Sequence, residues 1–330
     1  MEAFAYARPT TREEATSQLG IGFEEATVLA GGTDLLSLMK NYVETPKRLV
    51  DIKGVKEFGG ISHQATGVRI GATVTLEDLS QDPGIRKDFP GIAEAAAAVP
   101  SMQIRNMGTV GGDLLQRPRC WYYRNGFGLL ALSPGRHATS LVPGGDNRYH
   151  AILGNAGPAY FVNPSSLAPV LIALGAHLEI AGGKGSRKVA LEKFYRTPMA
   201  EDEREYVLAA NEIVTAILLP PDAAQWKTAI YEVREKQALD WPLAAAAVAL
   251  RMDGANNVHG ARIVLGHVAP VPWRAPEAER AIAGKPATAD HAAKAGEAAI
   301  AGAKPLSGNK YKVQLARVAV KRAILAAGRA

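Results

Sequence analysis

The chain has 330 residues, of which 47% are hydrophobic and 21% are charged, the proportions of a folded globular protein, which exclude wholesale disorder. Its net charge of +6 is modest, and Lys and Arg are interspersed with Asp and Glu, so neither nucleic acid nor a membrane surface is expected as a partner. Cys120 is the single cysteine, which excludes an internal disulfide and an iron–sulfur cluster held by this chain's thiolates alone.

The length predicts about two domains. The first residues lack a basic segment followed by an apolar one, and no apolar run approaches about 18 residues, so the sequence predicts neither a signal peptide nor a membrane span. We expect a cytoplasmic protein, or a periplasmic one if it is exported already folded on a partner that carries the signal.

The first part of the chain alternates short apolar runs with helical patterns, which is typical of strand–helix units. Glycines or prolines close most of these elements. The pattern predicts strands at 27–30, 49–52 and 68–70, and helices at 34–42 and 92–99.

The segment 116–156 is rich in turn residues and has no clear period, so we interpret it as an insertion. Regular structure resumes with a predicted helix at 167–174 and predicted strands at 176–180 and 213–218. The pair Pro220-Pro221 ends the last strand and marks a domain boundary.

The last hundred residues predict a compact α+β unit. Its alanine-rich segment at 243–250 favours a helix. The other predicted elements are strands at 229–233 and 261–267, a hairpin turn at 253–257, and helices within 275–303 and 311–328.

A strand, two glycines and a polar pair precede the helix at 34–42, in the string Ala30-Gly31-Gly32-Thr33-Asp34-Leu35. Glycines let backbone N–H groups approach an anion closely, which favours a phosphate here. An ordinary tight turn, with Thr33 or Asp34 as the N-cap residue, explains the same string.

A second segment of the same kind, Gly108-Thr109-Val110-Gly111-Gly112-Asp113-Leu114, suggests two loops that converge on one diphosphate. Neither segment matches the Rossmann glycine pattern or the P-loop, so both of those sites are disfavoured.

With these two segments the chain resembles the FAD-binding medium subunits of the molybdenum hydroxylases, which include xanthine dehydrogenase, carbon monoxide dehydrogenase and bacterial aldehyde oxidoreductases. Six ordered strings carry the resemblance, from Leu29 to the C-terminal region: 29–35, 49–52, 69–72, 103–112, 266–275 and 309–313.

The resemblance implies an α+β fold: a two-part FAD-binding domain of the vanillyl-alcohol-oxidase/PCMH type over residues 1–222, with subdomains at about 1–55 and 56–222, followed by a smaller C-terminal domain of the CO dehydrogenase flavoprotein type over 223–330. It also implies that both glycine segments wrap the FAD diphosphate and that Val99 packs near the flavin. The residues expected at the cofactor are Leu29, Ala30, Gly31, Gly32, Thr33, Asp34, Leu35, Val99, Thr109, Gly111, Gly112 and Asp113.

Two positions depart from the family pattern. Asp113 stands where asparagine is more common, and a carboxylate near a diphosphate is unfavourable unless it accepts hydrogen bonds from backbone N–H groups or ribose hydroxyls. Ser166 stands where many relatives have an aspartate close to the flavin ring.

The insertion resembles that of the bacterial aldehyde oxidoreductase subgroup, whose medium subunits bind an extra [4Fe-4S] cluster. Such a cluster needs about four thiolates and only Cys120 is present, so we predict the insertion without the cluster and interpret Cys120 as a packed, inert thiol. The neighbouring Trp121, Tyr122 and Tyr123, flanked by arginines, indicate either partner docking or packing over the flavin.

The charged cluster Arg234, Glu235, Lys236 and Asp240 is either a solvated face or a contact to flavin or a domain interface, with Lys236 as a further candidate at the cofactor. The histidines show no metal-ligand spacing, so no metal site is predicted.

No catalytic residue is expected, because the flavin carries the chemistry. The resemblance implies a heterotrimer in which electrons pass from [2Fe-2S] clusters of a small subunit through FAD to an external acceptor, while a large subunit with the molybdenum cofactor oxidises the substrate, which we expect to be an aldehyde. A docking subunit without redox function and a stand-alone flavin oxidase are the alternatives.

Overall fold

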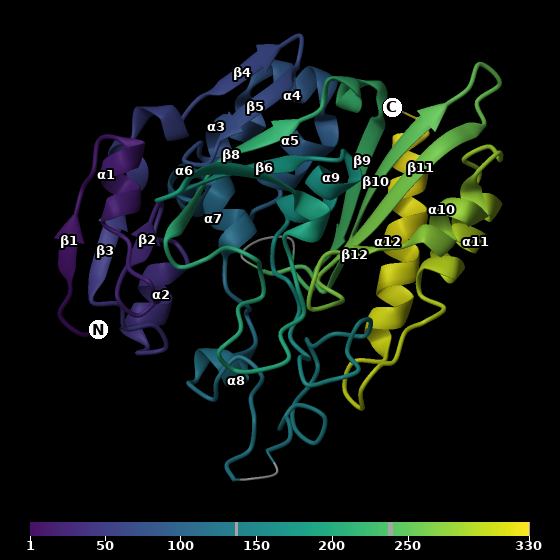
Figure 1. Ribbon diagram of the computed structural model, residues 1–330. Helices are drawn as coiled ribbons and strands as arrows, with labels where there is room; N and C mark the ends of the chain where they lie inside the picture. The colour runs from purple at the N-terminus through teal and green to yellow at the C-terminus, as the bar shows by residue number, and fades with distance from the viewer. Residues whose placement is uncertain (136–137, 237–239, 330) are drawn as a thin grey trace.

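The computed structural model describes residues 1–135, 138–236 and 240–329, and their strands form three sheets that follow one another along the chain (Figure 1). The first sheet is parallel, in the order β1-β3-β2. Parallel neighbours require crossover connections, and here short helices lie within them. A capping box between Thr11 and Glu14 begins the first helix. The elements are β1 (Ala5–Ala7), α1 (Arg12–Ser17), β2 (Thr27–Leu29), α2 (Leu35–Lys40) and β3 (Arg48–Asp51).

The second sheet is antiparallel, in the order β4-β5-β8-β6-β7. Its central strand β8 pairs with both β5 and β6 and so joins two parts of the sequence that the insertion separates. The strands are β4 (Ile61–Gln64), β5 (Gly67–Gly71), β6 (His177–Gly182), β7 (Gly185–Ala190) and β8 (Glu212–Leu219). The helices between β5 and β6 are α3 (Leu76–Gln81), α4 (Pro83–Asp88), α5 (Pro90–Ala97), α6 (Met102–Met107), α7 (Val110–Leu115), α8 (Trp121–Arg124) and α9 (Leu167–Ala173).

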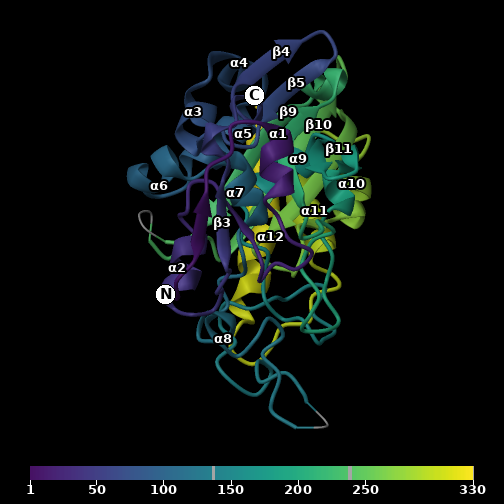
Figure 2. The same cartoon turned by 60° about the vertical axis from the view of Figure 1, so that its left-hand side comes forward.

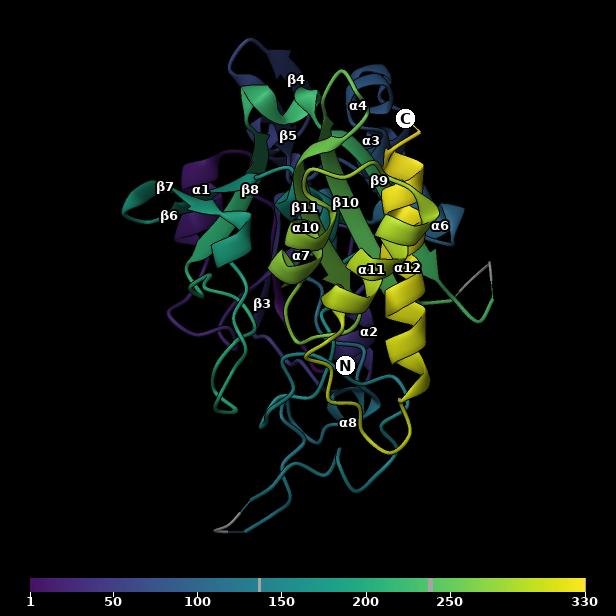
Figure 3. The ribbon, with the colours of Figure 1, turned by 90° about the vertical axis from the view of Figure 1, so that its right-hand side faces the viewer.

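The third sheet is antiparallel, in the order β12-β11-β10-β9, and α10, α11 and α12 lie along one side of it (Figure 3). Its strands are β9 (Lys227–Val233), β10 (Ala244–Met252), β11 (Val258–Gly266) and β12 (Trp273–Arg274), and its helices are α10 (Pro276–Ile282), α11 (Ala289–Ala299) and α12 (Tyr311–Ala327). The described residues contain no helix long and apolar enough to cross a membrane.

The helix predicted at 243–250 is wrong, because this segment is the strand β10. Alternate residues of β10 enter two different cores: Ala246 and Val248 pack with residues of α12, whereas Ala247 and Ala249 pack with residues of α9. A strand buried on both faces needs a continuous run of apolar residues, and burial between two cores outweighs the helix propensity of alanine.

The insertion at 116–156 extends away from the three sheets and lies at the bottom of Figures 1 and 2. Residues 136 and 137 lie outside the described residues, and α8 is the helix that the rest of the insertion contains. Its far end is fixed to the C-terminal domain, since Asn309 Nδ2 donates to the carbonyl oxygens of His150 and Ala151. Its near end is bonded to the N-terminal domain through Asp34, so hydrogen bonds to both domains hold this irregular segment in place.

Candidate functional site

The two glycine segments meet, although the sequence separates them widely. A Cβ atom on Gly31 would lie 1.8 Å from the carbonyl oxygen of Met107 and 3.1 Å from the Cα atom of Gly108. Only a glycine permits this approach of two backbones. The convergence that the sequence predicted is therefore present in the structure.

The first glycine segment carries free donors. The backbone N–H groups of Gly32, Thr33 and Asp34 have no hydrogen-bond partner within the described part of the chain, and Gly32 has a φ of 73°. The second segment is anchored instead, because the N–H groups of Val110 and Gly111 donate to the carbonyl oxygens of Val74 and Ala72. One loop thus offers hydrogen bonds to an anion, and the other supports it.

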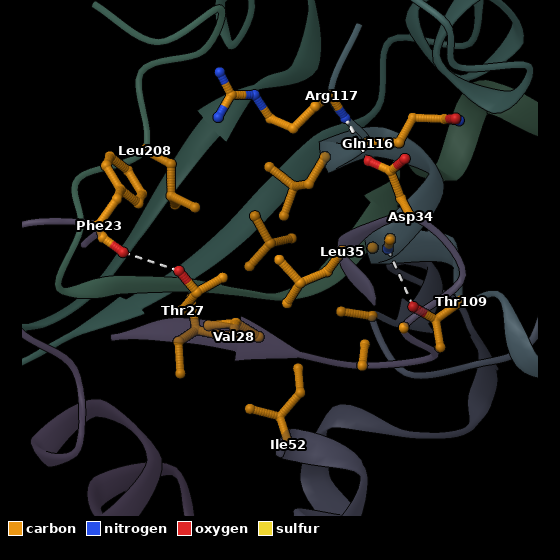
Figure 4. A pocket seen from close by; sticks show the side chains of 18 of the residues that line it. Phe23, Thr27, Val28, Asp34, Leu35, Ile52, Thr109, Gln116, Arg117 and Leu208 are labelled. Carbon is orange, nitrogen blue, oxygen red and sulfur yellow. Dashed lines mark hydrogen bonds between the residues drawn. The ribbon is translucent and has the colours of Figure 1, made fainter. Parts of the chain in front are cut away.

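A first pocket opens where the glycine segments meet, with a volume of about 1090 Å³ including the part open to solvent (Figure 4). Its floor is apolar and comes from the first sheet and from the segment around β8. Gly31, Gly32, Thr33, Thr109, Gly111 and Gly112 line it, together with Phe23, Val28, Leu35, Ile52 and Leu208.

A second pocket of about 700 Å³ adjoins the first. The two pockets share Thr33, Asp34, Thr109, Gly112 and Gln116. Val99 and Trp241 line the second pocket but not the first. Because the two pockets adjoin and share residues of both glycine segments, the pair suits an elongated ligand whose centre lies at these segments.

Most of the predicted cofactor residues line one of these pockets. Ala30 and Leu35 line the first pocket, and Val99 lines the second. Leu29 lines neither pocket and lies in β2, where its side chain packs beside Gly32.

Asp34 lines both pockets, but its carboxylate binds the insertion. It accepts hydrogen bonds from the Arg117 N–H group at 2.9 Å and from Arg124 Nη2 at 2.8 Å, and Arg119 Nη2 lies 3.5 Å away. The guanidinium groups of Arg119 and Arg124 offset the negative charge next to the free donors, so an anion can still bind there.

Asp113 is buried, and burial raises the pKa of its carboxyl group. The carboxylate accepts hydrogen bonds from the Leu167 N–H group at 3.1 Å and from Gln116 Nε2 at 2.9 Å, and Ser165 Oγ donates to it as well. Asp113 therefore meets the condition stated for a carboxylate at this position, since it accepts from the backbone at the start of α9.

Ser166 and Lys236 lie outside the described pockets. Ser166 Oγ donates to the buried Glu232 at 2.9 Å, and Glu232 also pairs with Arg234. Lys236 is exposed and its N–H group donates to Asp240, which lines the second pocket. Lys236 therefore stays a prediction as a cofactor contact.

A buried ion-pair network supports the first pocket, and sequence reasoning missed it. Arg117 Nε donates to Glu205 at 2.7 Å and its Nη1 donates to Glu44 at 2.5 Å. Glu44 also accepts from Arg204 at 3.0 Å, and the Arg204 guanidinium lies 4.3 Å from the Phe23 ring centroid. These residues come from distant segments and form no motif, so the sequence contained no signal for the network.

The insertion residue Cys120 lines a third pocket, away from the first. Its Sγ atom lies 3.1 Å from His150 Nε2, and burial raises the pKa of the thiol. In the part of the chain that the structure describes, no group of three or more His, Cys, Asp or Glu side chains is placed to hold a metal ion.

The three aromatic residues after Cys120 contact different parts of the structure. Tyr123 packs against Leu38 of α2 and donates to Glu44, whereas Trp121 lines the third pocket. Tyr122 lies edge-on to Phe127 within the insertion. None of the three lines the first or the second pocket, which counts against packing over a cofactor there, and partner docking stays a prediction.

Comparison with known proteins gives two family matches that together span most of the chain. Residues 2–222 match the FAD binding domain in molybdopterin dehydrogenase, and residues 229–327 match the CO dehydrogenase flavoprotein C-terminal domain.

Curated relatives and solved structures agree with these matches. The chain is 33% identical to the aldehyde oxidoreductase FAD-binding subunit PaoB of Escherichia coli (strain K12), over 86% of this chain and 87% of the relative. It is 31% identical to the carbon monoxide dehydrogenase medium chain of Hydrogenophaga pseudoflava, over 82% and 77% of the two chains. A crystallised carbon monoxide dehydrogenase of the same organism superposes with a TM-score of 0.76 at 30% identity, covering 99% of this chain and 97% of that one.

Proposed function

Because the chain belongs to the family of FAD-binding medium subunits of molybdenum hydroxylases, we propose that it is the electron-transfer flavoprotein of a three-subunit aldehyde oxidoreductase. Its partners are a small subunit with [2Fe-2S] clusters and a large subunit that carries the molybdenum cofactor and oxidises the aldehyde. The relative named as an aldehyde oxidoreductase subunit, similar over 86% of the chain, supports the choice of aldehyde.

The proposal rests on the close contact between the two glycine segments. Three unpaired N–H groups, on Gly32, Thr33 and Asp34, lie between two pockets, and this donor set fits the diphosphate of FAD. The apolar floor of the first pocket, with Val28 and Ile52, suits the adenosine end of the cofactor.

The residues of the second pocket, with Val99 and Trp241 among them, would then hold the flavin ring. Bound FAD supplies the capacity to take up and release two electrons. Val99 and Trp241 exclude water from the ring, and the anchored segment at Thr109 keeps the donors of the first segment in place. The role of this chain is thus to bind and orient the cofactor between its partners.

The test is the cofactor content of the purified chain and of the complex. We expect one FAD per chain, with flavin absorption near ~370 and ~450 nm, and copurification with the two partner chains. A colourless protein that cannot be reconstituted with FAD while it still binds its partners would identify a docking subunit instead. FAD-loaded chain that oxidises a substrate without partners would identify a stand-alone oxidase.

The substrate is tested on the assembled complex. Reduction of the bound FAD by aromatic and aliphatic aldehydes, but not by xanthine or carbon monoxide, is the expected result. The compartment stays a prediction: the cytoplasm, or the periplasm by export together with a partner.

A further inference from the structure

The third pocket lies between the insertion and the C-terminal domain and adjoins the second pocket. Arg119, Asp240 and Trp241 line both. The third pocket has a volume of about 800 Å³, including the part open to solvent. A ligand in the third pocket would therefore lie beside the ligand of the second pocket.

Four aromatic side chains form part of the wall of the third pocket. Trp121, Tyr149, Phe161 and Trp241 line it, and the Arg119 guanidinium lies 4.1 Å from the Trp241 ring centroid. Aromatic walls favour a flat, apolar ligand body, because they offer large rigid surfaces for ring packing.

Three buried nitrogens in this lining have no partner among the described residues: His150 Nδ1, His267 Nε2 and Arg119 Nε. His267 is only 3% exposed, and burial lowers the pKa of its imidazole to about 3, so the ring is neutral at pH 7. A neutral imidazole nitrogen either donates or accepts a hydrogen bond, depending on its tautomer, whereas Arg119 Nε only donates. Unpartnered buried polar groups are rare, and a ligand is one reason for them.

Lys312, the other cation in the pocket, is not available to a ligand. Its Nζ donates to the carbonyl oxygens of Tyr149, His150 and His267, at 3.1, 3.1 and 2.7 Å. These three bonds use every donor of the ammonium group. Lys312 therefore fixes the backbone that carries His150 and His267, where α12 approaches the insertion (Figures 1 and 3).

We propose that the third pocket binds a quinone as the external electron acceptor of the flavin. The aromatic walls pack against the quinone ring, and Arg119 and His267 hydrogen bond to its oxygen atoms. The inference rests on the proposed function, which places the flavin ring in the adjoining pocket.

The reaction balances with these two reactants alone. The reduced flavin gives up two electrons and two protons and returns to its oxidised form. The quinone takes up the same two electrons and two protons, so that both of its carbonyl groups become hydroxyl groups. The imidazole of His267 suits both states, because the nitrogen that donates to a carbonyl oxygen accepts from a hydroxyl in the other tautomer.

A nicotinamide dinucleotide fits this pocket less well. Its diphosphate requires several backbone donors, which glycine-rich turns usually supply, and none of the described residues that line the third pocket is a glycine. The third pocket offers aromatic side chains, whereas the glycine segments at the first pocket offer backbone N–H groups. The dinucleotide is therefore an alternative for the experiment to exclude.

The test uses the FAD-loaded chain and duroquinone (tetramethyl-1,4-benzoquinone). Every ring position of this quinone is substituted, so it cannot add to the thiol of Cys120. We expect saturable quenching of tryptophan fluorescence, because Trp121 and Trp241 line the pocket. Durene, the same ring with no oxygen atoms, reports the contribution of packing alone.

A matched pair of variants isolates His267, which lines the third pocket and neither of the other two. His267 has a φ of 61°, a conformation that asparagine tolerates well, so His267→Asn is expected to fold while its shorter side chain loses the hydrogen bond at the Nε2 position. His267→Gln places an amide nitrogen near that position. We expect His267→Asn to weaken duroquinone binding about tenfold, His267→Gln to restore most of it, and neither to change durene binding.

The outcomes separate the two proposals. A chain that holds FAD but shows no saturable duroquinone binding, or whose affinity is equal in both variants and the wild type, overturns the quinone site and leaves the proposed function intact. Displacement of duroquinone by NADH at comparable concentration also overturns it. A chain that binds no FAD overturns the proposed function, whatever duroquinone does.

Discussion

Replacing Gly31 by alanine tests the contact on which the cofactor site depends. The new Cβ atom would lie 1.8 Å from the Met107 carbonyl oxygen, whereas ordinary van der Waals contact begins at 3.4 Å, so the two loops must separate by about 1.6 Å. Overpacking of a rigid contact costs about 1–3 kcal/mol, and more where backbone must move. If this strain falls on the bound state, Gly31→Ala weakens FAD binding by about 10- to 100-fold.

The assay is a calorimetric titration of the apo-protein with FAD. Thermal unfolding tests whether each variant is folded. Gly183→Ala is the matched control, because nothing lies within 4 Å of its new Cβ atom, and it should bind FAD like the wild type. Gly111→Ala should be intermediate, since its Cβ would lie 3.0 Å from Ala72. Wild-type affinity in a folded Gly31→Ala variant would refute the reasoning that the two segments must touch to hold the diphosphate.

Three further predictions concern the insertion and its supports. Arg117→Met leaves Glu205 buried without its cation and should lower the free energy of unfolding by about 3–5 kcal/mol in urea denaturation, whereas Arg117→Met combined with Glu205→Leu should recover part of the loss. Burial lowers the pKa of His150 to about 4 and that of His267 to about 3, so the unfolded state binds more protons below pH 6.5. Stability should therefore fall by about 1.4 kcal/mol per pH unit for each histidine as the pH drops from about 6.5 towards 4, with a shallower slope in His150→Phe; an unchanged slope in that variant would contradict the assignment. Because a [4Fe-4S] cluster needs about four thiolates, elemental analysis of the purified chain should detect neither iron nor acid-labile sulfide, and stoichiometric iron would contradict a role for Cys120 as a packed thiol.

The strand β10 shows where reasoning from sequence failed. Its alanines have the propensity of a helix, and no periodicity contradicts that interpretation. What makes the segment a strand is its position between α9 and α12, where both faces are buried. Such a position depends on three segments at once and cannot be inferred from one of them.

The candidate site likewise combines residues whose role was predicted from sequence with residues whose role depends on the fold. The glycine segments were recognisable because close backbone approach and a positive φ require glycine wherever in the fold they occur. Asp34 was expected at the cofactor as well, and it does line both pockets, but its carboxylate binds arginines of the insertion. A side chain's partners depend on which distant segments come close, so residue type alone left this role open.

The family, its FAD cofactor and the two glycine segments could all be recognised from sequence, because these features reside in short, contiguous strings with strict backbone requirements. The Arg117–Glu205 network, the strand state of β10 and the pocket beside Trp241 become visible only in the folded chain. Each of these combines residues from separate parts of the chain, and burial, which sets both their packing and the pKa of their ionisable groups, exists only after the chain has folded.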